Sequence, residues 1–280
     1  MNKLTSKRFI ANSIHVLFLR LAHMLVSWKF KNKKVFVVCG MRRSGNHAFI
    51  NWLLNALEET ETSFEELKGD RVSVSESKKT IFFNEANFYG LKFFLKLIFE
   101  SKQAISNASN VIISIEDYVP REKYDPYFPN KATTVVIKRS TLNLVASRLK
   151  RAIDQAQKGK DRGDMAIDEP FFSKLNWIYS QSEGTGYACW SFDDWLVDKN
   201  SYRQRFLKKF ELKFDATPQM STQGGGSSFS GQSKIPTPSE MQARWSEIDW
   251  PQRVLKLAKT NCSLLNEHET VFISGKLSEN

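Results

Sequence analysis

Residues 33–54 contain a strand, a glycine-bounded loop and the start of a helix in direct succession. Residues 35–38 are Val-Phe-Val-Val, a run typical of a central parallel strand that is buried on both faces. Gly40 ends this strand, and an apolar helical pattern begins at Ala48. The amino end of a helix presents unpaired N–H groups and the positive end of the helix dipole, so a small-residue loop placed there favours a phosphate. The segment therefore predicts an α/β fold and a phosphate-bearing ligand.

The loop in this segment differs from the nucleotide-binding loop of nucleoside triphosphatases. Gly40 and Gly45 have the spacing of that loop, but Asn46 and His47 follow where Lys and Ser or Thr would stand. In the triphosphatases the lysine reaches the phosphates and the hydroxyl group binds magnesium. Here the cation lies inside the loop, at Arg43. The loop thus predicts a phosphate site without an obligatory metal. The alternative is an ordinary strand–glycine–helix join with surface arginines.

Strand and helix patterns alternate along the rest of the chain. This alternation predicts an α/β fold of the P-loop nucleotide-binding type, with a central parallel sheet flanked by helices. Strands are predicted at residues 79–84, 110–115, 133–138 and 186–191. Helices are predicted at residues 90–103, 140–156, 171–180, 200–210 and 238–247. Because ligands of such sheets bind at the carboxyl ends of the strands, we expect the functional residues there.

A second basic segment follows the strand predicted at 133–138. Arg139 leaves this strand, and Ser147 stands eight positions later, inside the next predicted helix. Ser140 or Thr141 can cap that helix. The arginine, the serine and the amino end of the helix could together bind a second phosphate. The alternative is a well-capped amphipathic helix with a solvated basic face.

Together, these segments resemble the sulfotransferases that use 3′-phosphoadenosine 5′-phosphosulfate (PAPS). Residues 43–47 (Arg-Ser-Gly-Asn-His) are similar to the family's 5′-phosphosulfate loop, and Arg139 with Ser147 is similar to its 3′-phosphate site. Residues 224–229 are similar to a later glycine-rich loop that contacts the nucleotide. The resemblance covers roughly residues 33–235 and implies that PAPS is the co-substrate and that no metal is required. It implies a nucleotide site made of Arg42, Arg43, Ser44, Gly45, Asn46, His47, Arg139, Ser147, Gly226, Ser227 and Ser228.

The resemblance also implies a mechanism, the in-line transfer of a sulfuryl group to an acceptor hydroxyl or amine. Arg43 stands where many members of the family carry lysine, and it would stabilise charge on the leaving 5′-phosphate. A general base would deprotonate the acceptor. Glu116 follows a predicted strand and is the best match to this base. Glu85, at the end of another predicted strand, is its competitor, and His47 is a third candidate.

Asp193 and Asp194 also follow a predicted strand. They could be catalytic carboxylates, but apolar residues follow at once, a pattern that favours a helix-capping role. Trp190 and Phe206 in the same region are interpreted as core residues rather than as a stacking platform.

Residues 1–32 are predicted to form an N-terminal amphipathic helical segment that precedes a sulfotransferase domain at residues 33–280. Residues 8–30 carry apolar side chains at helical spacing, but charged and polar residues interrupt the run. A membrane span is therefore not expected. The two remaining interpretations are packing against the domain and peripheral contact with an anionic membrane surface.

The charge and the cysteines of the chain limit its partners. The formal net charge of +11 favours anionic partners. The 3 cysteines lie far apart and in no metal-ligand spacing, which indicates a reducing, cytoplasmic environment, with or without peripheral membrane contact. No nucleic-acid-binding motif is evident, so nucleic acid is not an expected partner. We expect a small-molecule or glycan acceptor, such as a saccharide or a lipid. The alternative functions are a P-loop kinase or nucleoside triphosphatase and a non-catalytic polyanion-binding protein.

Overall fold

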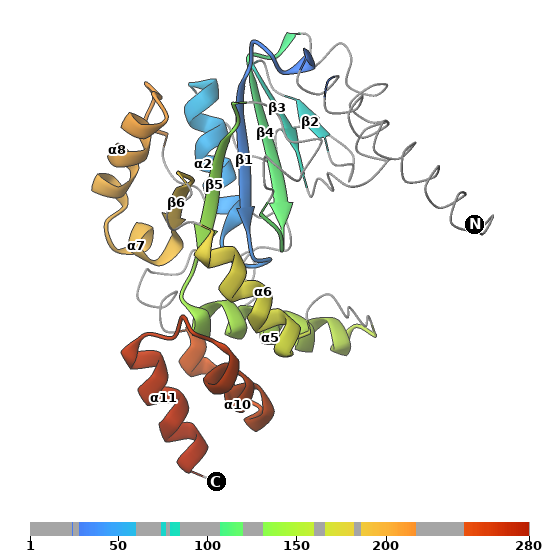
Figure 1. The fold of residues 1–280 in the computed structure, drawn as a ribbon, viewed down its shortest axis with the longest axis vertical. Helices are drawn as coiled ribbons and strands as arrows, with labels where there is room; N and C mark the ends of the chain where they lie inside the picture. Colours follow the sequence, from blue (N-terminus) through green and yellow to red (C-terminus); the bar gives the residue numbers. More distant parts are fainter. Residues whose placement is uncertain are drawn as a thin grey trace, which may run out of the picture. The chain divides into compact units, whose positions relative to one another are not determined.

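The computed structural model describes residues 24, 28–59, 74–76, 79–84, 107–119, 131–159, 166–181, 186–216 and 244–279. Strands among these residues form one sheet in the order β2-β3-β4-β1-β5-β6 (Figure 1). Their bounds are Lys34–Gly40 (β1), Val74–Glu76 (β2), Thr80–Phe83 (β3), Asn110–Glu116 (β4), Thr133–Lys138 (β5) and Ala188–Ser191 (β6). Five of these strands form a parallel sheet, and β2 adds an antiparallel strand beside β3 at one edge.

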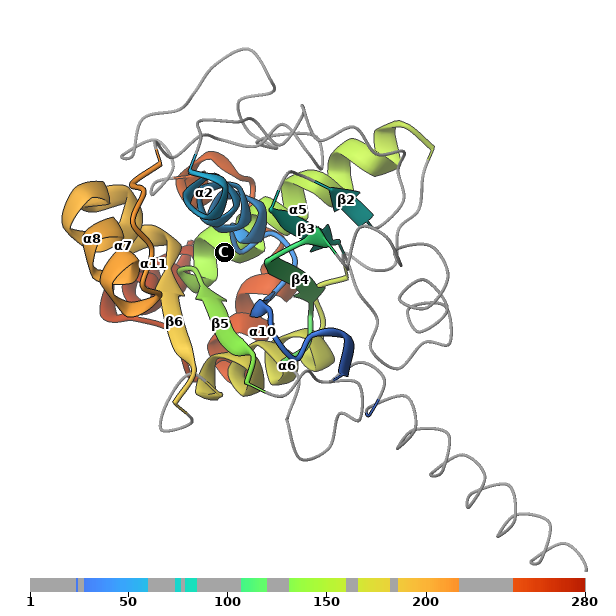
Figure 2. The same cartoon turned by 90° about the horizontal axis from the view of Figure 1, so that it is seen from above.

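Helices flank the sheet, so the predicted α/β fold with a central parallel sheet is confirmed. Seen from above, β5 and β6 lie between α2 on one face and α6 on the other (Figure 2). The helical elements are α2 (Asn46–Glu58), α5 (Thr141–Gln157), α6 (Glu169–Ser180), α7 (Phe192–Val197), α8 (Lys199–Lys209), the 3-10 helix η3 (Arg244–Glu247), α10 (Gln252–Asn261) and α11 (Glu267–Ser278).

The chain divides into two compact units, of which the first comprises residues 1–37, 68–115 and 120–134. In this unit β3 pairs with β4 in parallel register, with Ile81 opposite Val111. Both side chains are buried, as the apolar character of these two strands requires.

The second unit comprises residues 38–67, 116–119 and 135–280, and it includes the carboxyl ends of β1, β4 and β5. The side chain of Trp190 on β6 lies at the centre of an aromatic cluster in its core. The ring centroid of Trp190 is 4.7 Å from that of Phe49, 5.4 Å from that of Trp52 and 4.8 Å from that of Phe206. All four side chains are buried, so the interpretation of Trp190 and Phe206 as core residues is confirmed.

Most predicted elements coincide with observed ones, and β5 has the predicted bounds. The helix predicted at 90–103 lies outside the described residues, and of the one at 238–247 the structure describes only η3. The helices α10 and α11 are not among those predicted from the sequence. Helix α11 begins with a capping box, in which the side chains of Asn266 and Glu269 each accept a hydrogen bond from the other residue's backbone N–H. This pattern is visible in the sequence and marks the start of the helix.

Most of the amphipathic helix predicted at residues 8–30 lies outside the described residues, and the predicted boundary after residue 32 stays a prediction. None of the helices in the described ranges combines the length and the apolar character that crossing a membrane needs.

Candidate functional site

The loop between β1 and α2 depends on glycine at both ends. A Cβ atom at Gly40 would lie 2.5 Å from Asn46 Oδ1 and 2.7 Å from Ser44 Oγ, distances that real Cβ contacts do not show. Gly45 has a φ of 103°, in the left-handed region, and a Cβ atom there would collide with the ring of Phe192. The predicted Gly40-to-Gly45 spacing therefore reflects two close approaches of the backbone to its neighbours.

Polar groups line the inside of this loop. The Ser44 hydroxyl donates a 2.9 Å hydrogen bond to Asn46 Oδ1, and both side chains are buried. The buried Nδ2 group of Asn46 has no hydrogen-bond partner among the described residues. A buried donor of this kind is costly unless it is satisfied, so an anionic oxygen would be a favourable partner for it. Gly45, at the amino end of α2, supplies no side-chain cap.

The structure brings the two predicted phosphate-binding segments together. Arg43 Nε donates a 3.2 Å hydrogen bond to Ser147 Oγ on α5. Arg139 NH1 donates a 3.0 Å hydrogen bond to the carbonyl oxygen of Arg43, and the Arg139 guanidinium lies 5.1 Å from the ring centroid of Phe192. Residues that are far apart in sequence thus meet beside the carboxyl ends of β1 and β5, where ligands of parallel sheets bind.

The same residues place two positive charges close together. Arg139 is buried, and Arg43 is half-buried with a φ of 78°, a conformation that is strained for a residue other than glycine. Burial and then the positive charges of Arg139 and Arg151 lower the pKa of the Arg43 side chain to about 10. The carboxylates of Glu116 and Asp154 oppose this effect. At neutral pH Arg43 is therefore still charged, but its charge is less stable than in water. A bound anion would relieve this cost.

Buried side chains hold the turn between β5 and α5, which follows Arg139. The backbone N–H of Arg139 donates to the Tyr179 hydroxyl at 2.9 Å, and that hydroxyl donates to the Arg139 carbonyl at 3.0 Å. The N–H of Ser140 donates to Asp193 Oδ2, and the N–H of Leu142 donates to Glu269 Oε1 at 2.7 Å. Burial raises the pKa of both carboxyl groups. The charge of Arg139 and the N–H of Ser140 oppose the rise at Asp193, and the N–H of Leu142 opposes it at Glu269.

These contacts correct the prediction for the amino end of α5. Ser140 is the N-cap residue, but its side chain makes no capping hydrogen bond. The sequence predicts that the amino end of this helix can bind a phosphate, but the N–H groups of Ser140 and Leu142 already donate to carboxylates from α7 and α11. Asp193 does cap a helix, but it caps α5 rather than its own helix α7, where the Ser191 hydroxyl accepts from the backbone. Arg139 and Ser147 are therefore the groups of this segment for which anion binding stays a prediction.

A second charged cluster lies where β4 ends. Arg42 Nε donates to Glu116 Oε2 at 2.7 Å, and the backbone N–H of Arg42 donates to Asp117 Oδ1 at 2.9 Å. The backbone N–H of Asp117 in turn donates to the carbonyl oxygen of Gly40 at 2.8 Å. Arg148 NH1 lies 3.4 Å from Asp117 Oδ1. This cluster joins the predicted base Glu116 to the loop, with Arg42 turned towards Glu116.

Sequence reasoning missed several of these groups, namely Tyr179, Phe192, Arg148 and Glu269. Tyr179, Phe192 and Glu269 reach the site from α6, α7 and α11, which carry no local signature of an anion site, whereas Arg148 lies on α5 itself, next to the predicted Ser147. Four predicted site residues, Glu85, Gly226, Ser227 and Ser228, lie outside the described residues. His47 stands half-buried in the first turn of α2. The described part of the chain contains no group of three or more His, Cys, Asp or Glu side chains that could hold a metal ion.

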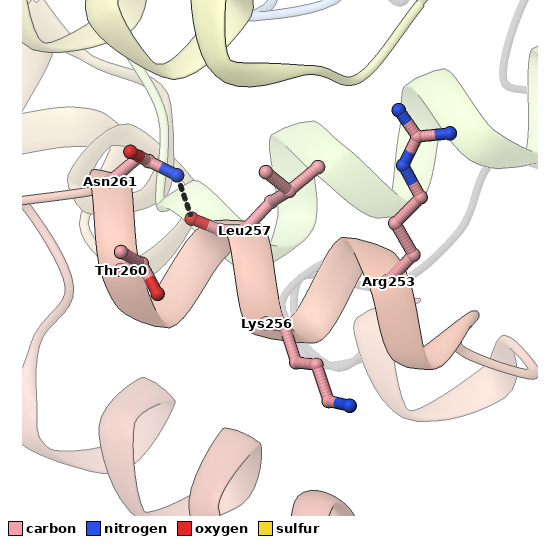
Figure 3. Close-up of a pocket in the computed structure, with 5 residues that line it drawn as sticks. All are labelled: Arg253, Lys256, Leu257, Thr260 and Asn261. Atoms are coloured by element: carbon pink, nitrogen blue, oxygen red, sulfur yellow. Dashed lines mark hydrogen bonds between the residues drawn. The ribbon is translucent and has the colours of Figure 1, made fainter.

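A separate hollow of about 400 Å³ runs along one face of α10 (Figure 3). It is lined by Arg253, Lys256, Leu257, Thr260 and Asn261, and the Asn261 side chain donates a 3.1 Å hydrogen bond to the Leu257 carbonyl. The hollow contains none of the predicted site residues.

No protein-family model matches the sequence, and no curated protein matches it significantly. Solved structures show a distant likeness, among them two sulfotransferase domains. The sulfotransferase domain from the curacin biosynthetic pathway shares 13% identity, with 88% of this chain and 98% of that chain covered and a TM-score of 0.43. The sulfotransferase domain from the Synechococcus PCC 7002 olefin synthase also shares 13% identity, with 89% and 96% covered and a TM-score of 0.41. Because both TM-scores are below 0.5, neither likeness assigns a function to this chain.

Proposed function

We propose that the chain is a sulfotransferase that binds PAPS beside the carboxyl ends of β1 and β5. One observation carries the proposal, namely the hydrogen bond from Arg43 Nε to Ser147 Oγ. It joins the loop suited to a 5′-phosphosulfate with the helix suited to a 3′-phosphate. PAPS carries phosphate groups at both of these positions, so one ligand can engage both elements.

Within this proposal, Arg43 and Asn46 act at the 5′ end of the co-substrate. The guanidinium of Arg43 neutralises charge that develops on the leaving phosphate as the sulfur–oxygen bond breaks. The buried Nδ2 group of Asn46 donates to an oxygen of the same group. Arg139 and Ser147 bind the 3′-phosphate. A magnesium ion is not part of the proposal, because the arginines supply the positive charge.

Glu116 is the proposed general base. It takes the proton of an acceptor hydroxyl or amine as the acceptor atom bonds to sulfur and adenosine 3′,5′-bisphosphate leaves. Two features of the structure support this role: Glu116 lies at the end of β4, and its charge acts on Arg43. The hydrogen bond from Arg42 holds one carboxylate oxygen and so orients the group. Glu85 stays the alternative base, and a saccharide or a lipid stays the proposed acceptor.

The proposal is tested first by ligand binding. Isothermal titration calorimetry is carried out with adenosine 3′,5′-bisphosphate in EDTA, with Mg·ATP, and with heparin as a generic polyanion. We expect binding of the bisphosphate without metal. Binding of Mg·ATP alone would instead indicate a kinase or triphosphatase, and binding of heparin alone would indicate a non-catalytic polyanion-binding protein.

Variants then locate the bound nucleotide. Arg139→Ala removes a buried charged donor, so we expect affinity for the bisphosphate to fall about 10- to 100-fold. Affinity for adenosine 5′-monophosphate should change little. Arg205→Ala removes an exposed arginine on α8 and serves as the charge-matched control. Equal losses for both nucleotides would contradict the assignment of Arg139. Transfer of labelled sulfate from PAPS to a panel of saccharides, lipids and amines then identifies the acceptor class.

A further inference from the structure

One buried carboxylate, that of Glu269, connects the amino ends of two helices. Its Oε1 atom accepts a 2.7 Å hydrogen bond from the N–H of Leu142 in the first turn of α5. Its Oε2 atom accepts a 3.1 Å hydrogen bond from the N–H of Asn266, which caps α11. Glu269 is only 4% exposed. Its negative charge therefore lies at the positive ends of two helix dipoles.

An ionised carboxylate is the group that suits this position. Both oxygens accept from N–H donors, and a carboxylate is an acceptor at both oxygens. A glutamine side chain has one acceptor oxygen, so its NH₂ group would face one of the two N–H donors. A helix cap alone does not require this arrangement, because Asn266 already accepts a 2.9 Å hydrogen bond from the N–H of Glu269.

The bond to Leu142 acts on the turn that carries the anion-binding groups. Leu142 lies three residues after Arg139, and Ser147 follows in the second turn of the same helix. Asp193 holds the intervening N–H of Ser140. Loss of the Glu269 contact would leave a buried N–H of α5 unsatisfied and would allow the turn to shift. A shift of this turn would displace Arg139 from the carbonyl oxygen of Arg43.

We propose that Glu269 is a positioning residue of the candidate site, which fixes Arg139 and Ser147 by bridging the amino ends of α5 and α11. This inference rests on the proposed function, because it assigns the positioned groups to the 3′-phosphate. It makes the C-terminal helix α11 part of the machinery that sets nucleotide affinity. Glu269 itself does not contact the nucleotide.

Glu269→Gln tests the inference against a purely structural role. We expect this variant to bind adenosine 3′,5′-bisphosphate at least about 10-fold more weakly, a loss typical of one buried hydrogen bond to a charged group. Its affinity for adenosine 5′-monophosphate should change less than about 2-fold, since the 5′ end of the site is not displaced. Asn266→Ala is the control, because it weakens the cap of α11 but leaves the Glu269 contact with Leu142 in place. It should lower Tm without changing affinity for either nucleotide.

Glu269→Asp provides a second variant in case the glutamine variant does not fold. It keeps the charge at the start of α11, but its shorter side chain withdraws from Leu142. We expect the same selective loss for the bisphosphate. Affinities equal to those of the wild type in both Glu269 variants, or equal losses for the two nucleotides, would overturn the inference.

A measurement without ligand separates this inference from the proposed function. Hydrogen–deuterium exchange of the peptide that covers residues 139–147 should be faster in either Glu269 variant than in the wild type and in Asn266→Ala. If the wild type bound no bisphosphate, the proposed function would fail, but faster exchange would still show that Glu269 holds this turn. Unchanged exchange would refute the positioning role whatever ligand the site binds.

Discussion

Replacing Arg43 by methionine removes a positive charge from the loop between β1 and α2 and keeps an unbranched apolar stem in place of the aliphatic part of the arginine. Arg43 lies near the buried charge of Arg139, and its own pKa is lowered to about 10. A pKa lowered from 12.5 in the unfolded chain to about 10 in the native state disfavours the charged form in the native protein. The charge should therefore destabilise the ligand-free protein at neutral pH.

The size of the effect follows from this pKa. Its difference from the ordinary value corresponds to roughly 3 kcal/mol, which we reduce to about 1.5–2 kcal/mol because Arg43 is partly exposed and water screens its charge. The variant also loses the hydrogen bond to Ser147, which contributes about 1 kcal/mol. We therefore expect Arg43→Met to raise the free energy of unfolding by about 0.5–1 kcal/mol. Its affinity for adenosine 3′,5′-bisphosphate should fall by about 100-fold.

Urea denaturation followed by tryptophan fluorescence measures the first quantity, and calorimetric titration measures the second. Lys150→Met is the control, because Lys150 makes a partly exposed ion pair with Asp154 and its loss should change stability by less than about 0.5 kcal/mol. If Arg43→Met lowered the free energy of unfolding by more than about 1 kcal/mol, the positive charge of Arg43 would stabilise the folded protein without a ligand. That result would contradict the inference that the loop is suited to an anion.

Three further predictions concern the loop, the buried carboxyl groups and the base. Gly45→Ala should destabilise the protein by more than about 2 kcal/mol in urea denaturation, since φ at Gly45 is positive and the added Cβ atom meets an aromatic ring. Gly275→Ala is the control: this glycine faces open space on α11, so the substitution should stabilise the protein by about 0.5–1 kcal/mol. Burial raises the pKa of Asp193 and Glu269, so their protonation stabilises the native state below the ordinary carboxyl pKa. This stabilisation should disappear as the pH rises through the raised pKa values of the two carboxyl groups. The free energy of unfolding, measured by urea denaturation across this pH range, should therefore depend less on pH in Glu269→Gln than in the wild type. An equal dependence on pH in the two proteins would contradict the raised pKa of Glu269. Glu116→Gln should lower kcat for sulfuryl transfer at least about 100-fold with bisphosphate affinity nearly unchanged, and full activity would move the base assignment to another carboxylate.

The parts of the site that sequence reasoning found are those with a local signature. Gly40 and Gly45 mark the loop because only glycine tolerates the close contacts and the positive φ found there. Arg139 directly follows β5, and Ser147 lies eight positions later, in the second turn of α5. Such spacings are visible in a short window of sequence.

The contacts that hold these groups in place have no such signature. Asp193 and Ser140 are 53 residues apart, and Glu269 and Leu142 are 127 residues apart. Local patterns predict a helix-capping role for Asp193, but they do not show that the helix it caps is α5. They also leave the amino end of α5 available to a phosphate, and this expectation is wrong, because a buried N–H group bonds to whichever acceptor the packing of distant helices brings near it.

The α/β alternation, the glycine-bounded loop and the spacing of the basic residues can be predicted from the sequence, since each follows from periodicity or from the backbone conformation of a few consecutive residues. The contacts between these segments arise on folding: Arg43 meets Ser147, Arg42 pairs with Glu116, and carboxylates from α7 and α11 accept hydrogen bonds at the amino end of α5. Local patterns do not reveal these contacts, because hydrogen bonds and charge interactions act over a few ångströms in space, and distance along the chain does not determine which residues come that close.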